Sequence, residues 1–387
     1  MSIDEESALS TPSCAWATLL TSENLLPGLV VFAHSLLVEH ASEYPLVIMA
    51  TSKLSVRART ILKTMLPEGK AIIRDVEPFY PASTATGLAY ARFNEVWTKL
   101  RAFELTEFSR VALVDSDMLV RSNMDELFSD PYVFGNKGQE EGETEWIGAS
   151  WACTCNPNRV PTYPAEWIPA NCGYTDQTLP SASSSSTVTQ PTHPCPRPKR
   201  LINSGLVILS PSSSTMNEMI QVINTDPRIP EYCFPDQDFL ADFFTSSSSP
   251  RKIRYLPYKY NALKKLRIIH PNIWSDEEAM NIHYILDKPW VLGRPGGKKN
   301  VEGMDPDAEI HSWWWSAFDR VKAQQTFVHL NGKANGHANS NAVSANLNGH
   351  TNGYTNGHTN GKKKDHLVIR LSEQDWRECV EKYMTLN

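Results

Sequence analysis

The sequence lacks several features that define whole classes of protein. It contains no run of about 18 apolar residues, so no membrane-spanning helix is predicted. Residues 1–11 are acidic and polar, without the basic and apolar regions of a secretory signal, so a cytoplasmic protein is expected. The net charge of −6 leaves no overall basic field, which argues against nucleic acid as a partner.

Cysteine is scarce, and its number is odd. In a chain expected to be cytoplasmic, 7 cysteines favour reduced thiols over a disulfide framework. Four of them gather in one irregular stretch: Cys153, Cys155, Cys172 and Cys195. A structural zinc site is one interpretation of this group, but the spacing matches no common zinc ribbon or finger. Reduced, packed thiols are the other interpretation.

The chain also lacks a Gly-x-Gly-x-x-Gly motif after its first predicted strand, so it has no dinucleotide-binding fingerprint. The first 130 residues instead alternate short apolar runs with helical patterns. Strands are predicted at 15–20, 46–50, 71–76 and 111–114, and helices at 29–39, 56–66 and 94–108. Repeated β-α-β units predict an α/β fold with a mostly parallel sheet covered on both faces.

The organisation changes after residue 130. A strand at 201–209, a helix at 237–244 and a core segment at 255–265 follow an irregular insertion. The Asn, Gly and His tract near the end cannot bury apolar surface and is predicted to be a linker. The predicted parts are a disordered start at 1–12, one catalytic domain at 13–325 with its insertion at 131–200, a linker at 326–365 and a C-terminal helical segment at 366–387.

Two carboxylates follow a predicted buried strand. Asp115-Ser116-Asp117 comes directly after the apolar run at 111–114, at the carboxyl end of the strand. Ligands of open α/β sheets bind at that edge. If the chain stays extended, both carboxylates point the same way and can hold a divalent cation against phosphate oxygens.

Several separated segments resemble glycosyltransferase family 8, the glycogenin and galactinol synthase group. They are 97–100, 110–120 with the two aspartates, 123–128, Asn203-Ser204-Gly205, Asp236-Gln237-Asp238, and His283 followed by Lys288-Pro289-Trp290. The resemblance covers about residues 15–315. It implies a GT-A fold and retaining transfer of a hexose from a nucleotide sugar, usually a UDP-sugar, with Mn²⁺.

The resemblance also implies roles for single residues. The implied metal ligands are Asp115, Asp117 and His283, and this set of oxygen and nitrogen donors suits Mn²⁺. The implied donor-binding residues are Leu19, Thr21, Ser116, Asn203, Ser204 and Lys288, with Lys288 on the diphosphate and Asn203 and Ser204 on sugar hydroxyls. The implied catalytic residues are Lys99, near the donor phosphate or sugar, and Asp236 and Gln237, beside a cationic transition state.

The chain departs from the family pattern in the places that set specificity. Leu25 stands where glycogenins have an aromatic ring, and the spacing from His283 to Lys288 is one residue shorter and lacks a glycine. The stretch 261–274 contains no tyrosine, so self-glucosylation there is not expected. Trp313-Trp314-Trp315 is interpreted as core packing or a lid anchor, with sugar stacking as the alternative.

These departures favour an external acceptor, which is a small polyol, a lipid or a glycan. A self-glucosylating primer is one alternative function, and a non-catalytic scaffold that retains the fold is another. The expected partners are therefore a nucleotide-sugar donor and an acceptor. The sequence leaves the oligomeric state open and is compatible with a dimer.

Overall fold

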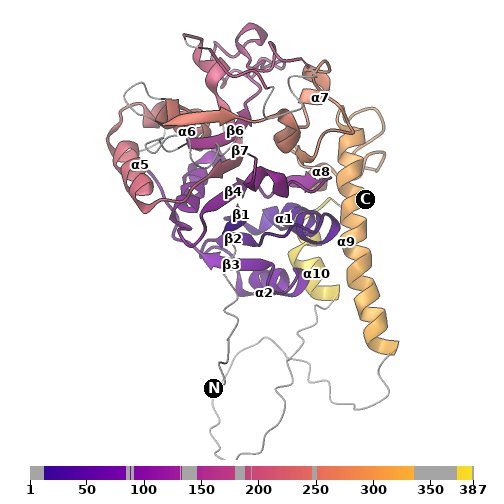
Figure 1. Cartoon of the computed structure of the whole chain (residues 1–387). Helices are drawn as coiled ribbons and strands as arrows, with labels where there is room; N and C mark the ends of the chain where they lie inside the picture. The colour runs from indigo at the N-terminus through magenta and orange to yellow at the C-terminus, as the bar shows by residue number, and fades with distance from the viewer. Residues whose placement is uncertain are drawn as a thin grey trace, which may run out of the picture.

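A mixed β-sheet of seven strands forms the centre of the protein in this computed structural model (Figure 1). The structure describes residues 13–83, 88, 91–130, 132, 146–178, 188–192, 194–245, 251–334 and 373–385. The strands are β1 (Cys14–Leu20), β2 (Leu46–Ala50), β3 (Ala71–Asp75), β4 (Arg110–Val114), β6 (Trp146–Trp151), β7 (Ile202–Leu209) and β8 (Lys252–Tyr255). Their order across the sheet is β3-β2-β1-β4-β7-β6-β8.

The sheet is mostly parallel. Strand β7 is antiparallel to β4 and β6, and the other neighbouring pairs of this sheet are parallel. All residues of β2 and nearly all of β1 and β4 are buried, as expected for strands covered on both faces. The predicted α/β fold class is confirmed.

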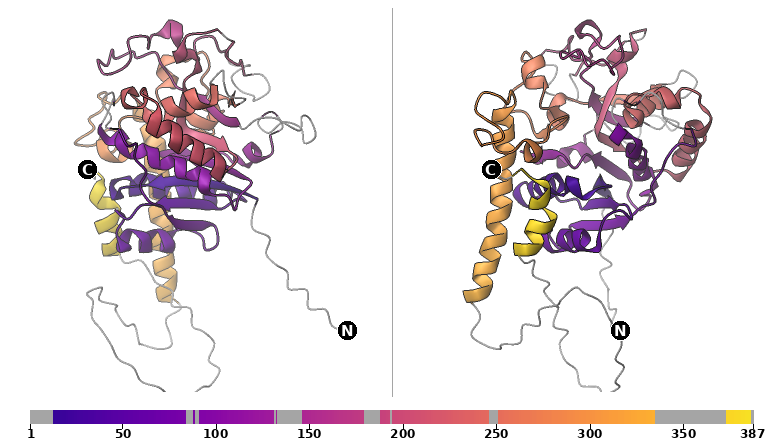
Figure 2. Two further views of the ribbon diagram at one scale, coloured as in Figure 1. Left: turned by 90° about the vertical axis from the view of Figure 1, so that its left-hand side faces the viewer. Right: turned by 180° about the vertical axis from the view of Figure 1, so that it is seen from behind.

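Helices cover both faces of this sheet. The helices are α1 (Leu26–His34) with a π-helical turn η2 (Ser35–Glu39), α2 (Val56–Met65), η3 (Ala91–Glu104), α5 (Ser213–Thr225), α6 (Pro235–Thr245), α9 (Ala308–Ala334) and α10 (Glu373–Cys379). Figures 1 and 2 show α1, α2, α9 and α10 on one side of the sheet and α5 and α6 on the other. None of the helices in the described part of the chain is long and apolar enough to cross a bilayer.

The predicted elements and the observed ones differ in several places, of which three bear on the site and its boundaries. The helix expected at 94–108 is a 3₁₀ helix, η3, that ends at Glu104. The insertion at 131–200 contains strand β6, which the sequence analysis missed because its centre is the weakly strand-forming Gly148-Ala149-Ser150. Helix α9 continues to Ala334, past the boundary at residue 325. The predicted segment 1–12, and the linker beyond Ala334, lie outside the described residues.

An aromatic cluster joins the two last helices to the core. Trp314 is fully buried, with its ring centroid 5.2 Å from Trp290 and 5.5 Å from Phe318, and Phe318 lies 5.7 Å from Trp376 of α10. No residue of the triplet at 313–315 is among those lining the large cavity described below. Core packing is therefore confirmed for Trp314, and sugar stacking by it is excluded by burial.

A buried polar network fixes the start of α9. The ammonium group of Lys264 donates to Nε2 of His311 at 2.9 Å and lies 3.1 Å from Asp307. His311 is fully buried, and its Nδ1 lies 2.5 Å from a carboxylate oxygen of Asp305. Burial first, and then the charge of Lys264, lowers the pKa of His311.

Candidate active site

The two predicted carboxylates stand between the main sheet and a smaller one. Strand β4 ends at Val114, and the N–H of Asp115 donates to the carbonyl of Gly205 on β7 at 2.9 Å. The chain then enters β5 (Met118–Val120), which pairs with β10 (Asn281–His283); β10 in turn pairs with β9 (Ala262–Leu263). The side chains of Asp115 and Asp117 are 25% and 13% exposed, so both remain partly accessible.

His283 meets both carboxylates because of strand register. In the antiparallel β5–β10 pair, Met118 lies opposite His283, which brings the imidazole beside Asp117. Nε2 of His283 is 3.4 Å from Asp117 and 3.8 Å from Asp115. The structure thus brings together the three residues predicted as metal ligands, with their ligand atoms all within 4.8 Å of one another.

Asn261, which the sequence analysis missed, orients this histidine. Its Oδ1 accepts a hydrogen bond from Nδ1 of His283 at 2.9 Å, which leaves the lone pair of Nε2 facing the carboxylates. The amide group of Asn261 in turn donates to Oδ1 of Asn203 at 2.9 Å, and both Asn261 and His283 are buried. No local sequence signal marks Asn261, because its role arises only from the pairing of β9 with β10.

The motif Asn203-Ser204-Gly205 on β7 supports this arrangement. Asn203 accepts from the Gly205 N–H at 3.0 Å, and a Cβ on Gly205 would lie 2.6 Å from Nδ1 of His283. Ser204 donates to Asp236 at 2.7 Å. Asn203 and Ser204 both line the cavity and also hold other site residues; the sugar contacts predicted for them stay a prediction.

Two lysines balance the carboxylates. Lys99 on η3 lies 2.7 Å from Asp115 and 3.1 Å from Asp236. Burial alone would lower the pKa of Lys99, but the two carboxylates outweigh burial and raise that pKa. Lys288 donates to Asp117 and to the carbonyl of Tyr284, the latter at 2.7 Å.

The ionisation of Asp117 follows from these neighbours. Burial would raise the pKa of Asp117, but Lys288 and then His283 outweigh burial and hold that pKa well below its usual range. Asp117 is therefore a carboxylate at neutral pH. In this state it can bind a cation.

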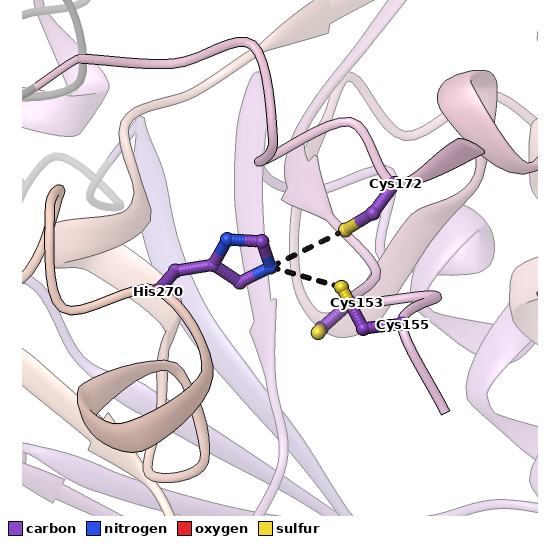
Figure 3. Close-up of side chains that lie close together, drawn as sticks. All are labelled: Cys153, Cys155, Cys172 and His270. Carbon is purple, nitrogen blue, oxygen red and sulfur yellow. Dashed lines mark hydrogen bonds between the residues drawn. The ribbon is translucent and has the colours of Figure 1, made fainter. Parts of the chain in front are cut away.

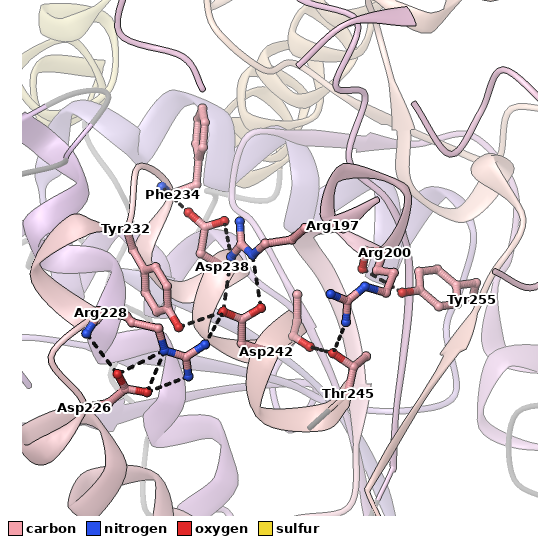
Figure 4. Close-up of polar contacts among 11 residues, drawn as sticks. Arg197, Arg200, Asp226, Arg228, Tyr232, Phe234, Asp238, Asp242, Thr245 and Tyr255 are labelled. Carbon is pink, nitrogen blue, oxygen red and sulfur yellow. Dashed lines mark hydrogen bonds and ion pairs between the residues drawn. The ribbon is translucent and has the colours of Figure 1, made fainter. Parts of the chain in front are cut away.

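Asp236 and Gln237 lie in the first turn of α6, whose position an ion network fixes (Figure 4). Arg197 pairs with Asp238 at 3.1 Å and with Asp242 at 3.2 Å, and Asp238 accepts from the N–H of Phe234 at 2.8 Å. This last bond satisfies a backbone donor at the start of the helix. The network holds α6 so that its first turn faces Lys99 and Ser204.

A cavity of about 1160 Å³ contains this site. All the site residues predicted from the sequence line it: Leu19, Thr21, Lys99, Asp115, Ser116, Asp117, Asn203, Ser204, Asp236, Gln237, His283 and Lys288. Leu25, Lys53 and Tyr80 line it as well, close to the carboxyl ends of β1, β2 and β3. Residues of the insertion and of α7 (Leu266–Ile269) form another part of its wall.

Leu286 explains the missing glycine between His283 and Lys288. Its φ is +62°, in the left-handed region that glycine adopts without steric cost. The backbone therefore turns as a glycine would allow, although leucine occupies the position. This turn lets the ammonium group of Lys288 reach Asp117, although the spacing from His283 to Lys288 is one residue shorter than in glycogenin.

The cysteine-rich stretch also comes together, but not as a group of four cysteines. Cys153, Cys155 and Cys172 gather around His270, and Cys195 is not part of this group. His270 is the residue that the sequence analysis did not connect with the cysteines. A third group, Asp305, Asp307 and His311, already has lysine partners.

Comparison with known proteins finds plant relatives. No protein-family model matches the chain. Galactinol synthase 2 of Solanum lycopersicum is 27% identical over 277 residues, which cover 70% of this chain and 70% of that protein. Galactinol synthase 6 of Arabidopsis thaliana is 27% identical over 297 residues, 76% of this chain and 77% of that protein. The solved structure of the galactosyltransferase LgtC with donor and acceptor sugar analogues is also similar. The alignment covers 79% of this chain and 95% of the LgtC chain, at 16% identity and a TM-score of 0.45.

Proposed function

We propose that the chain is a glycosyltransferase related to family 8, with a GT-A fold, and that it is a metal-dependent, retaining hexosyltransferase that moves a sugar from a UDP-sugar to a small polyol. One observation carries the proposal: Asp115, Asp117 and His283 converge at the carboxyl edge of the sheet, inside a cavity that also holds two lysines. A site of this kind suits a donor with a diphosphate. The named plant relatives favour the galactinol synthase-like acceptor class.

The residues of the site fit a divalent cation. Nε2 of His283 is held toward Asp117 and Asp115 by the bond from Nδ1 to Asn261, as in metal sites with a fixed histidine tautomer. Two carboxylates and one imidazole are a donor set that Mn²⁺ accepts. A bound cation would supply Lewis-acid stabilisation of the departing diphosphate.

The bond that would break joins the anomeric carbon of the sugar to the diphosphate. Lys288 would act on the diphosphate, and the first turn of α6 would act on the anomeric carbon. Lys288 can move its ammonium group from Asp117 to the diphosphate of the leaving group. Lys99 holds Asp236 and Asp115 in place. Asp236 and Gln237 present a carboxylate and an amide to the cavity, where they would face the positive charge that develops at the anomeric carbon.

The base of the donor would lie at the carboxyl ends of β1–β3. Leu19 and Thr21 line this part of the cavity, and Leu25 offers no aromatic ring. Tyr80 lines the same cavity with a side chain that is 41% exposed. Its ring can therefore provide the stacking surface that Leu25 lacks.

The positions of the two tyrosines nearest the expected self-glucosylation site support an external acceptor. Tyr258 and Tyr260 are 1% and 3% exposed, and the Tyr260 hydroxyl donates to Glu126 at 2.6 Å. A hydroxyl held in this way cannot approach an anomeric carbon to the roughly 3–3.5 Å that transfer requires. The proposal includes a cytoplasmic location, where cysteines stay reduced, and none of the 7 cysteines is in a disulfide in this structure.

The test is a panel of nucleotide sugars, each incubated with Mn²⁺ and with or without small polyols, with released nucleotide as the readout. Release from a UDP-sugar is expected to rise when the correct polyol is present. Asp117→Asn and a chelator should each abolish release, whereas Asp319→Asn, on the exposed surface of α9, should not. Absence of release from every donor, or full release by Asp117→Asn, would refute the proposal.

Intact-mass spectrometry of the protein after incubation with donor and Mn²⁺ separates the two acceptor classes. No added hexose is expected. A ladder of hexose additions would instead establish self-glycosylation. Tyr80→Phe and Tyr163→Phe would then locate the acceptor, because both tyrosines line the cavity.

A further inference from the structure

Three cysteines and one histidine form a second cluster in the cysteine-rich insertion (Figure 3). Cys153 and Cys155 follow strand β6, Cys172 lies after a long turn, and His270 follows α7. Cys155, Cys172 and His270 are 5%, 0% and 5% exposed. Figure 3 shows the imidazole pointing at the sulfur atoms. Residues from distant parts of the chain thus direct four potential ligands at one point.

The distances match a tetrahedral metal centre. Zinc–sulfur bonds of about 2.3 Å and a zinc–nitrogen bond of about 2.0 Å place sulfur and nitrogen about 3.5 Å apart at tetrahedral angles. Nε2 of His270 lies 3.2 Å from the sulfur of Cys155 and 3.6 Å from that of Cys172. All four ligand atoms lie within 4.8 Å of one another.

We propose that Cys153, Cys155, Cys172 and His270 bind one structural zinc ion. Three thiolates and an imidazole complete a four-coordinate site, which leaves no position for water or substrate and so marks the ion as structural. A disulfide would use only two of the three sulfur atoms and would not explain the imidazole.

The zinc would fix one wall of the large cavity. Cys153 lines that cavity, as do Asn156 from the insertion and Ile268 and Ile269 from α7. Cys172 of the insertion and His270, which follows α7, are 98 residues apart in sequence, and the cluster joins them. The ion would therefore hold together two segments that line the cavity.

Metal content tests the site without any measurement of turnover, so its result is independent of the proposed transferase activity. The full-length protein is expressed with zinc in the medium and purified without chelator. Mass spectrometry of the metals should then find about one zinc per chain. Titration of the thiols with a mercurial reagent should release this zinc as three thiols react. A metal-free protein, or an intact mass that shows a disulfide, would overturn the proposal.

Matched variants assign the zinc to this cluster. Cys172→Ser should lose the zinc, whereas Cys195→Ser, a cysteine outside the cluster, should keep it. Asp117→Asn should also keep it, which separates this site from the candidate active site. If Cys172→Ser does not fold, Co²⁺ replaces zinc in the wild-type protein. Tetrahedral d–d bands with thiolate-to-cobalt charge transfer are then expected, and their absence would overturn the proposal.

Discussion

Replacing Asn261 with alanine should weaken Mn²⁺ binding without touching any metal ligand. Asn261 is fully buried, and its Oδ1 accepts the Nδ1–H of His283 at 2.9 Å. Alanine removes this acceptor, so the imidazole loses both its fixed orientation and its fixed tautomer. Nε2 of His283 would then no longer be held with its lone pair toward Asp117 and Asp115.

The size of the effect follows from the type of contact. Loss of a partner that orients a metal-binding histidine costs about 10- to 100-fold in metal affinity. This range corresponds to about 1.4–2.8 kcal/mol of binding free energy. Asn261 also donates to Asn203 at 2.9 Å, so an additional loss of folding free energy of about 1–3 kcal/mol is expected.

Calorimetric titration with Mn²⁺ measures the affinity directly, and donor hydrolysis as a function of Mn²⁺ concentration provides a second readout. Asn261→Asp keeps an acceptor for His283, so its affinity should lie closer to wild type than that of Asn261→Ala. Asn300→Ala is the control, because Asn300 is also buried but donates to Gly293 and Asp305. A Kd for Mn²⁺ that Asn261→Ala leaves within about twofold of wild type would refute the role assigned to Asn261.

Three further predictions concern stability. Burial and then Lys264 lower the pKa of His311, so the unfolded state binds more protons below about pH 6.5, and urea unfolding should show lower stability at pH 5.5 than at pH 7.5. His311→Gln should reduce this difference, and an unchanged difference would contradict the assignment. Leu286→Gly relieves a left-handed conformation that costs about 1–2 kcal/mol, so thermal unfolding should show no loss of stability, whereas Leu286→Val should destabilise. Trp376→Ala should cost about 3–5 kcal/mol in chemical denaturation, because the indole is 5% exposed; an unchanged midpoint would show that α10 does not contribute to the core.

The central sheet could be predicted where its strands are continuous apolar runs. Strands β1, β2, β4 and β7 lie where the sequence placed them, because central strands of a sheet buried on both faces are mostly apolar. Strand β6 has Gly148 and Ala149 at its centre, and its place depends on pairing with β7 and β8. Such pairing between distant segments leaves no local signal.

The residues of the candidate site also fall into two groups, those with a local sequence signal and those without one. Asp115 and Asp117 could be found because a strand and two carboxylates are contiguous, and His283 because a recognisable Lys-Pro-Trp follows it. Asn261 and His270 could not be found. Their roles arise from contacts made in three dimensions, with His283 through the short β9–β10 pair and with Cys172 across 98 residues of chain.

The charges around Lys99 and Lys288 imply that donor and cation bind cooperatively. Asp115, Asp117 and Asp236 face only two ammonium groups, so the site holds one negative charge in excess. A divalent cation alone would make the net charge of the site positive, and a diphosphate alone would make it more negative. The charges of the cation and the diphosphate nearly cancel each other, so each ligand should raise the affinity for the other by the same factor. A protein that carries its own internal counter-ions in this way favours entry of the cation and the nucleotide sugar as one nearly neutral pair.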